Sequence, residues 1–166
     1  MIELAVVHTP IDALTLAAKD GRLCVLHFGA KEASVRAAVH RWYPGEPIER
    51  RPDPAGAATA LAKYFSGQLD VLDTIAIEMN GTPFQQRVWQ ALRTVRAGHT
   101  ASYSAIAAAI GAPSAVRAVG AANGANPIAV IVPCHRVIGS NGSLTGYGGG
   151  LRRKEWLLRH EGRRLF

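Results

Sequence analysis

Apolar positions in the first part of the chain fall into short runs separated by turn residues. Residues 2–8, 14–18 and 23–28 are rich in aliphatic side chains, and each run has the length and composition of a strand. Gly21 predicts a turn between the second run and the third. The beginning of the chain is therefore expected to form a small sheet.

Helical spacing replaces these runs further along. Val35 and Val39 repeat at that spacing within residues 31–42, which predicts a helix, and residues 55–65 predict another. The residues between them, 43–54, are rich in proline and glycine and predict a loop.

The second half of the chain begins with a strong helix-start signal. Thr82 suits the N-cap, Pro83 the first helical position, and Gln85 can close a capping box. Gly98 is expected to end this helix. Its apolar face would comprise Phe84, Val88, Leu92 and Val95.

Two shorter helices are predicted next, over residues 103–110 and 114–122, around a tight turn with Gly111 and Pro113. This layout is a candidate helix-turn-helix motif, although it is equally typical of an alanine-rich packed core. Arg117 favours the motif, because small neighbours would let the helix approach a DNA groove closely while the arginine reaches bases or phosphates. Those neighbours are Ala115, Ala118, Gly120, Ala121 and Ala122.

A continuous apolar run over residues 128–132 predicts a buried strand that leads directly into Pro133 and Cys134. His135 and Arg136 follow, and nearby cations favour the thiolate, which is the nucleophilic form of cysteine. A lone cysteine is more commonly an inert buried thiol. In an extended chain, moreover, His135 would point away from Cys134, so it would need a turn or a bridging water to act as a base.

The end of the chain combines a turn at Asn141–Gly142, a glycine-rich loop over residues 146–150 and a helix over residues 151–160. The loop lacks the spacing of a phosphate-binding motif. It is either a flexible connector or a segment whose backbone closely approaches a ligand.

Charge separates the two parts of the chain. Residues 1–77 contain 8 Lys and Arg against 9 Asp and Glu, whereas residues 78–166 contain 11 against 3, and the whole chain has a net charge of +7. A basic second half suits contact with a polyanion such as DNA, and it suits a merely solubilising surface equally well.

The chain has no apolar run long enough to cross a membrane and no secretory signal, so a cytoplasmic protein is expected. Its two cysteines are too few for a disulfide framework and are expected to be free thiols. Cys24 and His27 are too few ligands for a zinc site, so core packing is expected there and no metal is predicted.

Together, these segments resemble one family, the O6-alkylguanine-DNA alkyltransferases. The resemblance extends from residue 84 to residue 162 in the family's order, while residues 1–77 match only in layout. The matching segments are residues 84–89, Ser102–Tyr103, residues 117–120 (RAVG), residues 131–139 (IVPCHRVIG), residues 146–151 (GYGGGL) and Lys154.

The resemblance implies a role for each matched residue. Cys134 would accept the alkyl group, His135 would help to deprotonate it through a water molecule, and Glu161 would hold His135. Asn126 would support the turn that carries Cys134. Tyr103 would help to swing the target nucleotide out of the duplex and would then hydrogen-bond the base.

The resemblance also implies a DNA-binding surface and a pocket. Arg117 would fill the gap left in the duplex, with Ala118, Ala121 and Tyr103 contacting the DNA. The guanine pocket would be lined by Val137, Tyr147, Gly148 and Lys154, the last with a structural or weakly catalytic role. Ser104 and Ala105 depart from the Gly-Glu that often follows the family's tyrosine, and we expect a small effect.

The predicted fold class is α/β. The resemblance implies a ribonuclease H-like N-terminal domain over residues 1–77 and a mainly helical domain with a winged helix-turn-helix-like motif over residues 78–166. It also implies single-use transfer from O6-alkylguanine, and from O4-alkylthymine, to Cys134. No cofactor is expected, and the partner would be alkylated double-stranded DNA, bound by a monomer, with cooperative binding left open and no membrane involved.

Two rival functions differ in their chemistry. A helix-turn-helix regulator or lesion sensor would bind DNA without reacting, and a cysteine hydrolase or redox protein would use Cys134 in another reaction. Cys134 itself argues against those relatives of the family that have tryptophan at this position and only bind lesions.

Overall fold

The computed structural model describes residues 1–162 of the 166-residue chain. It divides into two compact units, the first comprising Met1–Asn80 and Pro127–Ile131, and the second comprising Gly81–Asn126 and the chain from Val132 onward. A boundary after residue 77 remains a prediction. A single boundary at that position would assign residues 127–131 to the second unit, whereas they belong to the first.

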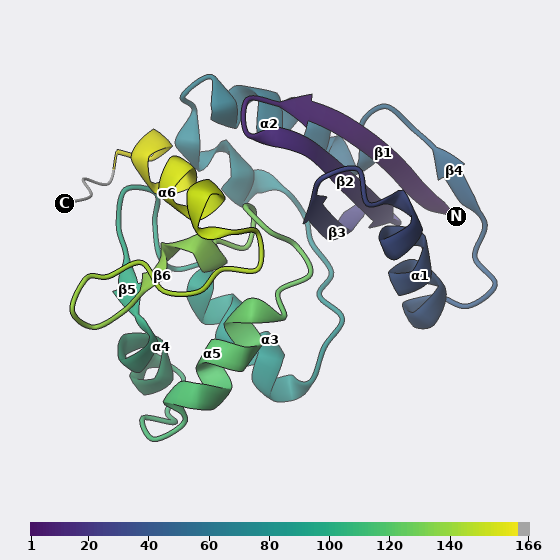
Figure 1. Cartoon of the computed structure of the whole chain (residues 1–166). Coiled ribbons are helices and arrows are strands. Elements are labelled where there is room, and N and C mark those ends of the chain that lie inside the picture. The colour runs from purple at the N-terminus through teal and green to yellow at the C-terminus, as the bar shows by residue number, and fades with distance from the viewer. Residues whose placement is uncertain (163–166) are drawn as a thin grey trace. The chain divides into compact units, whose positions relative to one another are not determined.

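The first unit is built on a four-stranded sheet with the order β3-β2-β1-β4 (Figure 1). β1 (Ile2–Thr9), β2 (Asp12–Lys19) and β3 (Arg22–Phe28) are antiparallel neighbours, which confirms the three predicted strands. Asp20 and Gly21, the two residues between β2 and β3, both have positive φ, as a tight hairpin turn requires.

One strand of this sheet was missed. β4 (Ile48–Arg50) runs parallel to β1 inside the segment that was predicted to be a loop, with Ile48 opposite Ile2. Its three residues are too few to produce an alternating pattern, and their pairing with a distant strand leaves no local signal.

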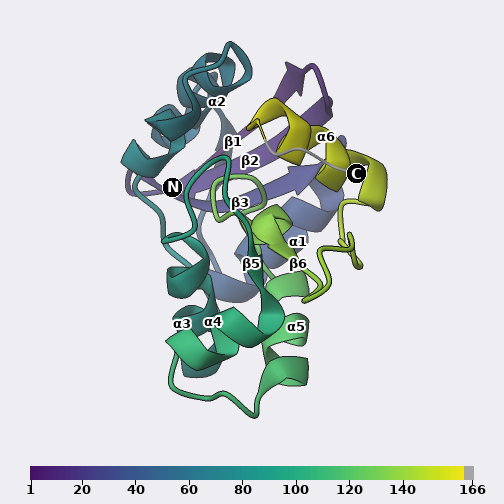
Figure 2. The same ribbon diagram turned by 90° about the vertical axis from the view of Figure 1, so that its left-hand side faces the viewer.

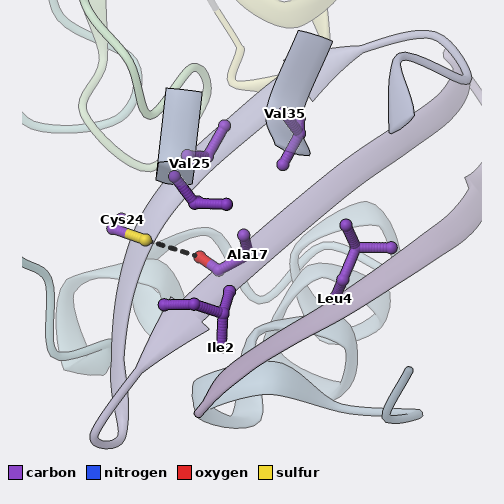
Figure 3. Close-up of a cluster of buried hydrophobic side chains, with 7 residues drawn as sticks. Ile2, Leu4, Ala17, Cys24, Val25 and Val35 are labelled. Carbon is purple, nitrogen blue, oxygen red and sulfur yellow. Dashed lines mark hydrogen bonds between the residues drawn. The ribbon is translucent and has the colours of Figure 1, made fainter. Parts of the chain in front are cut away.

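A helix covers one side of this sheet. α1 (Glu32–Trp42) contributes Val35 and Val39 to a buried cluster, as its spacing predicts. Figure 3 shows Cys24 within this cluster, where its Sγ donates to the carbonyl of Ala17 at 3.4 Å. The expected core role of Cys24 is confirmed. The strand residues of the cluster are Ile2, Leu4, Ala17, Cys24 and Val25.

α2 (Ala57–Phe65) lies on the opposite side of the sheet from α1 (Figure 2). It is flanked by two 3₁₀ helices, η1 (Pro54–Gly56) and η2 (Leu69–Thr74). Within residues 1–162, no helix has both the length and the apolar character that a membrane crossing requires.

The prediction of a strand over residues 128–132 is wrong. Only Ile128 forms a bridge, with Leu26, and the chain then turns, with Val130 at a φ of 70°. A buried apolar run without alternation does not distinguish a strand from a buried turn, and here the turn is the outcome. Cys134 therefore does not follow a strand.

The second unit is mainly helical. α3 (Pro83–Leu92) begins with the predicted capping box, because the Thr82 side chain accepts from the Gln85 amide while the Gln85 side chain accepts from the Thr82 amide. The helix ends earlier than expected. Thr94 binds the carbonyl of Ala91 through both its amide and its hydroxyl, so Val95 lies beyond the helix.

α4 (Tyr103–Ala109) and α5 (Val116–Gly124) are the two helices of the predicted helix-turn-helix, α5 starting two residues later than expected. Both contact each other and α3 (Figure 1). β5 (Ala101–Ser102) pairs in parallel with β6 (Val137–Ile138), and α6 (Leu151–His160) follows the glycine-rich loop. The predicted α/β class, with a strand-and-helix unit followed by a helical one, is confirmed.

Candidate active site

Cys134 opens a 3₁₀ turn, η3 (Cys134–Arg136), just before β6. The amide of Arg136 donates to the carbonyl of Pro133 at 3.0 Å, and the amide of Cys134 donates to the carbonyl of Val132 at 2.8 Å. Cys134 is buried, with 6% of its surface exposed. The opposite facing expected for neighbours in an extended chain therefore does not apply to Cys134 and His135, because the backbone here is a 3₁₀ turn.

Two asparagines hold this turn through its backbone. Asn126 donates from Nδ2 to the carbonyl of Val132 at 2.8 Å, which is the contact that its expected supporting role requires. Asn123, on α5, donates from Nδ2 to the carbonyl of Cys134 at 3.4 Å. Sequence reasoning missed Asn123, and its only signal was a polar residue on the inner side of an alanine-rich helix.

His135 and Glu161 form a buried pair, as the resemblance implied. Nε2 of His135 lies 2.9 Å from Oε2 of Glu161, and both side chains are fully buried. Nδ1 of His135 is also buried and has no hydrogen-bond partner within residues 1–162. One ring nitrogen of His135 is thus held by Glu161, and the other is available for proton transfer.

Arg136 completes the cluster and was not assigned this place by sequence. Its Nε donates to Oε1 of Glu161 and its Nη2 to Oε2, both at 2.9 Å, while Nη1 donates to the carbonyl of Val95 at 2.6 Å. The expectation that Arg136 favours the thiolate of Cys134 needs revision, because its guanidinium is bound to Glu161.

Burial and charge set the protonation states of this cluster. Burial lowers the pKa of His135, although Glu161 acts in the opposite direction, so the imidazole is neutral at neutral pH. Burial by itself would raise the pKa of Glu161. The ion pairs and hydrogen bonds with His135 and Arg136 outweigh it and hold that pKa well below its ordinary value.

The thiol of Cys134 is protonated in the resting site. Burial raises its pKa, while Asn126, Tyr147 and the charge of Lys154 act to lower it. A buried thiol that is surrounded by groups favouring the thiolate is inert until a base accepts its proton.

Lys154, on α6, is fully buried beside the glycine-rich loop. Its Nζ donates to the carbonyl of Val137 at 2.6 Å and to the carbonyl of Thr145 at 3.0 Å. Burial lowers the pKa of Lys154 to about 8. These contacts tie the loop to β6 and fit the structural role considered for this lysine.

The other residues expected in the pocket lie in this loop and in β6. Val137 is fully buried in β6, whereas Tyr147 is half-buried and Gly148 exposed. Tyr103 starts α4, and its hydroxyl oxygen accepts from Oγ1 of Thr145 at 3.2 Å. Thr145 therefore links Tyr103 to the loop, a contact that the sequence did not indicate.

The expected DNA-contacting residues lie on an outer face of the helix-turn-helix. Arg117, Ala118 and Ala121 are all exposed on α5. Trp89 holds α5 against α3 from inside, donating from Nε1 to the carbonyl of Ala122 at 2.8 Å. Arg87 of α3 donates to the carbonyl of Ile110 at the end of α4.

The structure thus gathers Cys134, His135, Glu161, Asn126 and Lys154 at the η3 turn and the backbone on either side of it, while Arg117, Ala118 and Ala121 are exposed on α5 of the same unit. In the part of the chain that is described, His, Cys, Asp and Glu side chains do not gather in threes as a metal site would require.

Both units match one family. Residues 83–163 match the family described as "6-O-methylguanine DNA methyltransferase, DNA binding domain", and residues 2–79 match its "ribonuclease-like domain". A relative called methylated-DNA–protein-cysteine methyltransferase, from Mycolicibacterium paratuberculosis, is 48% identical over 166 residues, which cover 98% of this chain and 94% of the relative.

Solved structures are similar over nearly the whole chain. The O6-methylguanine methyltransferase of Mycobacterium tuberculosis is 43% identical with a TM-score of 0.80, and the match covers 99% of this chain and 96% of that one. The structure of Mycobacterium tuberculosis OGT in complex with DNA is 45% identical with a TM-score of 0.76, covering 96% and 92% of the two chains.

Proposed function

This chain belongs to the 6-O-methylguanine DNA methyltransferase family, and on that premise we propose that it repairs DNA by moving an alkyl group from O6-alkylguanine onto Cys134. O4-alkylthymine is the second substrate in the proposal. The protein would act in the cytoplasm as a monomer on double-stranded DNA, and would need no cofactor.

One observation carries the proposal: the buried thiol of Cys134 shares a turn with His135, whose Nε2 is bound by Glu161 while Nδ1 has no partner within residues 1–162. Activation of a cysteine needs a base beside the nucleophile and a third group that orients the base, and these residues provide all three. Burial keeps the thiol protonated until substrate is in place.

The transfer is balanced in protons and electrons. The Cys134 proton passes through a water molecule to Nδ1 of His135, and Glu161 stabilises the resulting imidazolium. The thiolate attacks the alkyl carbon, so that a C–S bond forms while the C–O6 bond breaks. The electron pair of that bond goes to the guanine, which leaves neutral once it gains a proton.

Tyr103 is the proposed donor of that last proton. Its hydroxyl oxygen already accepts a hydrogen bond from Thr145, so the phenolic proton is directed elsewhere. The thiol has then lost one proton and the guanine has gained one. After Tyr103 is reprotonated and His135 deprotonated by solvent, the cluster has its starting charge.

The lesion lies inside a base stack, so the nucleotide must be flipped out before the thiol can reach it. The exposed face of α5 suits this step. Ala118 and Ala121 add little bulk, and Arg117 is long enough to occupy the space left in the duplex. The excess of basic residues after position 77 supplies attraction to the phosphates.

The test is to incubate the protein with a duplex that contains O6-methylguanine and to measure its intact mass, followed by mapping of the modified peptide. One methyl group on the peptide that carries Cys134 is the expected result. Tight binding with an unchanged mass would favour the rival lesion sensor. Turnover of an ester substrate without an adduct would favour the rival hydrolase.

A further inference from the structure

The side chain of Arg136 is nearly buried, and all three of its nitrogens are bound inside the second unit. Two of them donate to the two oxygens of Glu161 and the third donates to the carbonyl of Val95. An arginine keeps its charge under all ordinary conditions, so it is a permanent counter-charge for a buried carboxylate.

This counter-charge decides which atoms of the cluster carry protons. Glu161 receives two donors from Arg136, and an ionised carboxylate can only accept hydrogen bonds. Nε2 of His135, 2.9 Å from Oε2 of Glu161, must therefore carry a proton. In a neutral imidazole, Nδ1 then holds the lone pair.

We propose that Arg136 is a positioning residue for alkyl transfer, which holds Glu161 as a carboxylate and thereby fixes His135 in the Nε2–H tautomer, with Nδ1 left to accept the proton of Cys134. The inference rests on the proposed function, in which His135 is the base. It adds the reason why the base presents Nδ1.

Without Arg136, the buried carboxylate would lose the permanent positive charge that donates to both of its oxygens. Burial then favours an additional proton on the pair, either on Glu161 or on the imidazole. A protonated Glu161 would donate to Nε2 and shift the imidazole proton to Nδ1, whereas an imidazolium carries protons on both nitrogens. In both states Nδ1 no longer accepts a proton.

The other charged and titratable groups around His135 do not replace Arg136. Lys154 lies near enough to lower the pKa of His135, but its ammonium donates to two backbone carbonyls. The thiol of Cys134 is protonated at rest. Arg136 is thus a cation that donates to both oxygens of Glu161.

The contact with Val95 explains why the residue is an arginine. It anchors the guanidinium to the backbone just after α3, so the two remaining nitrogens face Glu161 in a fixed orientation. A lysine would supply the charge as a single point and could not make the same directed contacts. Arg136→Lys should therefore restore activity only in part.

A direct readout is the nitrogen NMR spectrum of His135 in the wild-type protein at neutral pH. We expect a protonated Nε2 and an unprotonated Nδ1. An imidazolium, or a proton on Nδ1, would overturn the inference even if methyl transfer to Cys134 is normal. If the wild-type protein transferred no methyl group at all, the proposed function would fail instead, so the two failures are distinguishable.

A second readout is the pH dependence of the transfer rate in Arg136→Gln and Arg136→Lys, with Arg159→Gln as the control that removes an exposed arginine–glutamate pair from the neighbouring helix. Arg136→Gln should lose on the order of 100-fold at neutral pH, the usual contribution of a general base. The deficit should shrink at alkaline pH, where the His135–Glu161 pair loses its additional proton.

The transfer rate of Arg136→Lys should lie between those of wild type and Arg136→Gln, and that of Arg159→Gln should match wild type. A deficit that is constant with pH, or full activity of Arg136→Gln, would overturn the inference.

Discussion

At the scale of single residues, the two cysteines have opposite surroundings. Cys24 is in the sheet core, where burial raises its pKa to about 12 and its Sγ donates to the carbonyl of Ala17. Cys134 lies in a turn beside His135, with Asn126, Tyr147 and Lys154 favouring its thiolate. In the proposed function, only Cys134 has a base to activate it, because His135 adjoins it in the η3 turn.

Cys134→Ser should therefore abolish methyl transfer, because a hydroxyl is a far weaker nucleophile than a thiolate. Binding to the alkylated duplex should persist, since the α5 face is unchanged. Cys24→Ser is the matched control, and it should retain transfer. The measurement is methyl transfer and duplex affinity for each variant. If Cys24→Ser lost transfer while Cys134→Ser retained it, Cys24 and not Cys134 would be the alkyl acceptor.

Glu161 also gives a prediction on stability. Because its folded pKa is held below its ordinary value, its contribution is fully present above the unfolded pKa of about 4.3 and disappears as the pH falls through the folded value. Glu161→Gln leaves Arg136 buried without its carboxylate, so it should cost about 3–5 kcal/mol at neutral pH and progressively less in acid.

Urea unfolding at neutral and at acidic pH would measure that difference. Glu155→Gln is the control, because Glu155 pairs with Arg159 at an exposed position of α6 and should change the free energy of unfolding by less than about 1 kcal/mol. Equal effects of the two substitutions, or a Glu161→Gln deficit that grows in acid, would contradict this account of the buried cluster.

The resemblance predicted which residues lie together near the η3 turn better than it predicted their contacts. Cys134, His135 and Glu161 were identified by resemblance, and the structure brings the last two to hydrogen-bond distance. Arg136 was expected to assist the thiolate, yet it binds Glu161. Thr145 showed no signal, because a threonine in a loop is compatible with almost any partner.

At the scale of elements, local signals succeeded and distant pairings did not. The capping box at Thr82 was predicted from four adjacent residues and is present. β4 depends on β1, far away in sequence, and was missed. Residues 128–132 form a turn, because Val130 takes a positive φ that an apolar pattern does not encode.

α5 leads to a prediction about DNA. Arg117→Ala should slow repair in a duplex by about tenfold or more, because flipping a base costs a few kcal/mol, while repair of the free modified base stays unchanged. Arg96→Ala, which removes another exposed arginine of the same unit, is the control for lost charge. Equal slowing by Arg117→Ala on both substrates would show that Arg117 has no part in flipping.

The glycine-rich loop leads to a prediction about pocket size. Gly148, Gly149 and Gly150 add no bulk, so benzyl as well as methyl adducts should be accepted. Gly148→Trp should reduce benzyl transfer more than methyl transfer. The backbone tolerates this change, because a Cβ at Gly148 would lie 3.9 Å from the nearest atom, the carbonyl oxygen of Gly124.

Competition between the two adducts would measure this effect, with Gly146→Trp as the control for bulk elsewhere in the loop. Gly150 is unsuitable, since its φ of 91° would strain any side chain. Rejection of the benzyl adduct by the wild-type protein would refute the open pocket.

At the scale of the whole molecule, two units share one chain but differ in charge and architecture. The acidic first part forms the sheet unit, and the residues proposed for chemistry and DNA contact all belong to the basic second unit. The resemblance could predict two domains. It could not predict that residues 127–131 rejoin the first unit, because that return depends on backbone contacts with Leu26.

The central claim is that Cys134 takes one alkyl group and keeps it. The product is a thioether, and its release would require a nucleophile that expels a thiolate, for which water is too weak. The direct test is to count methyl groups removed per protein molecule in the presence of excess methylated duplex. We predict a plateau near one, with the group on Cys134. A count that continues well above one would show turnover and contradict the claim.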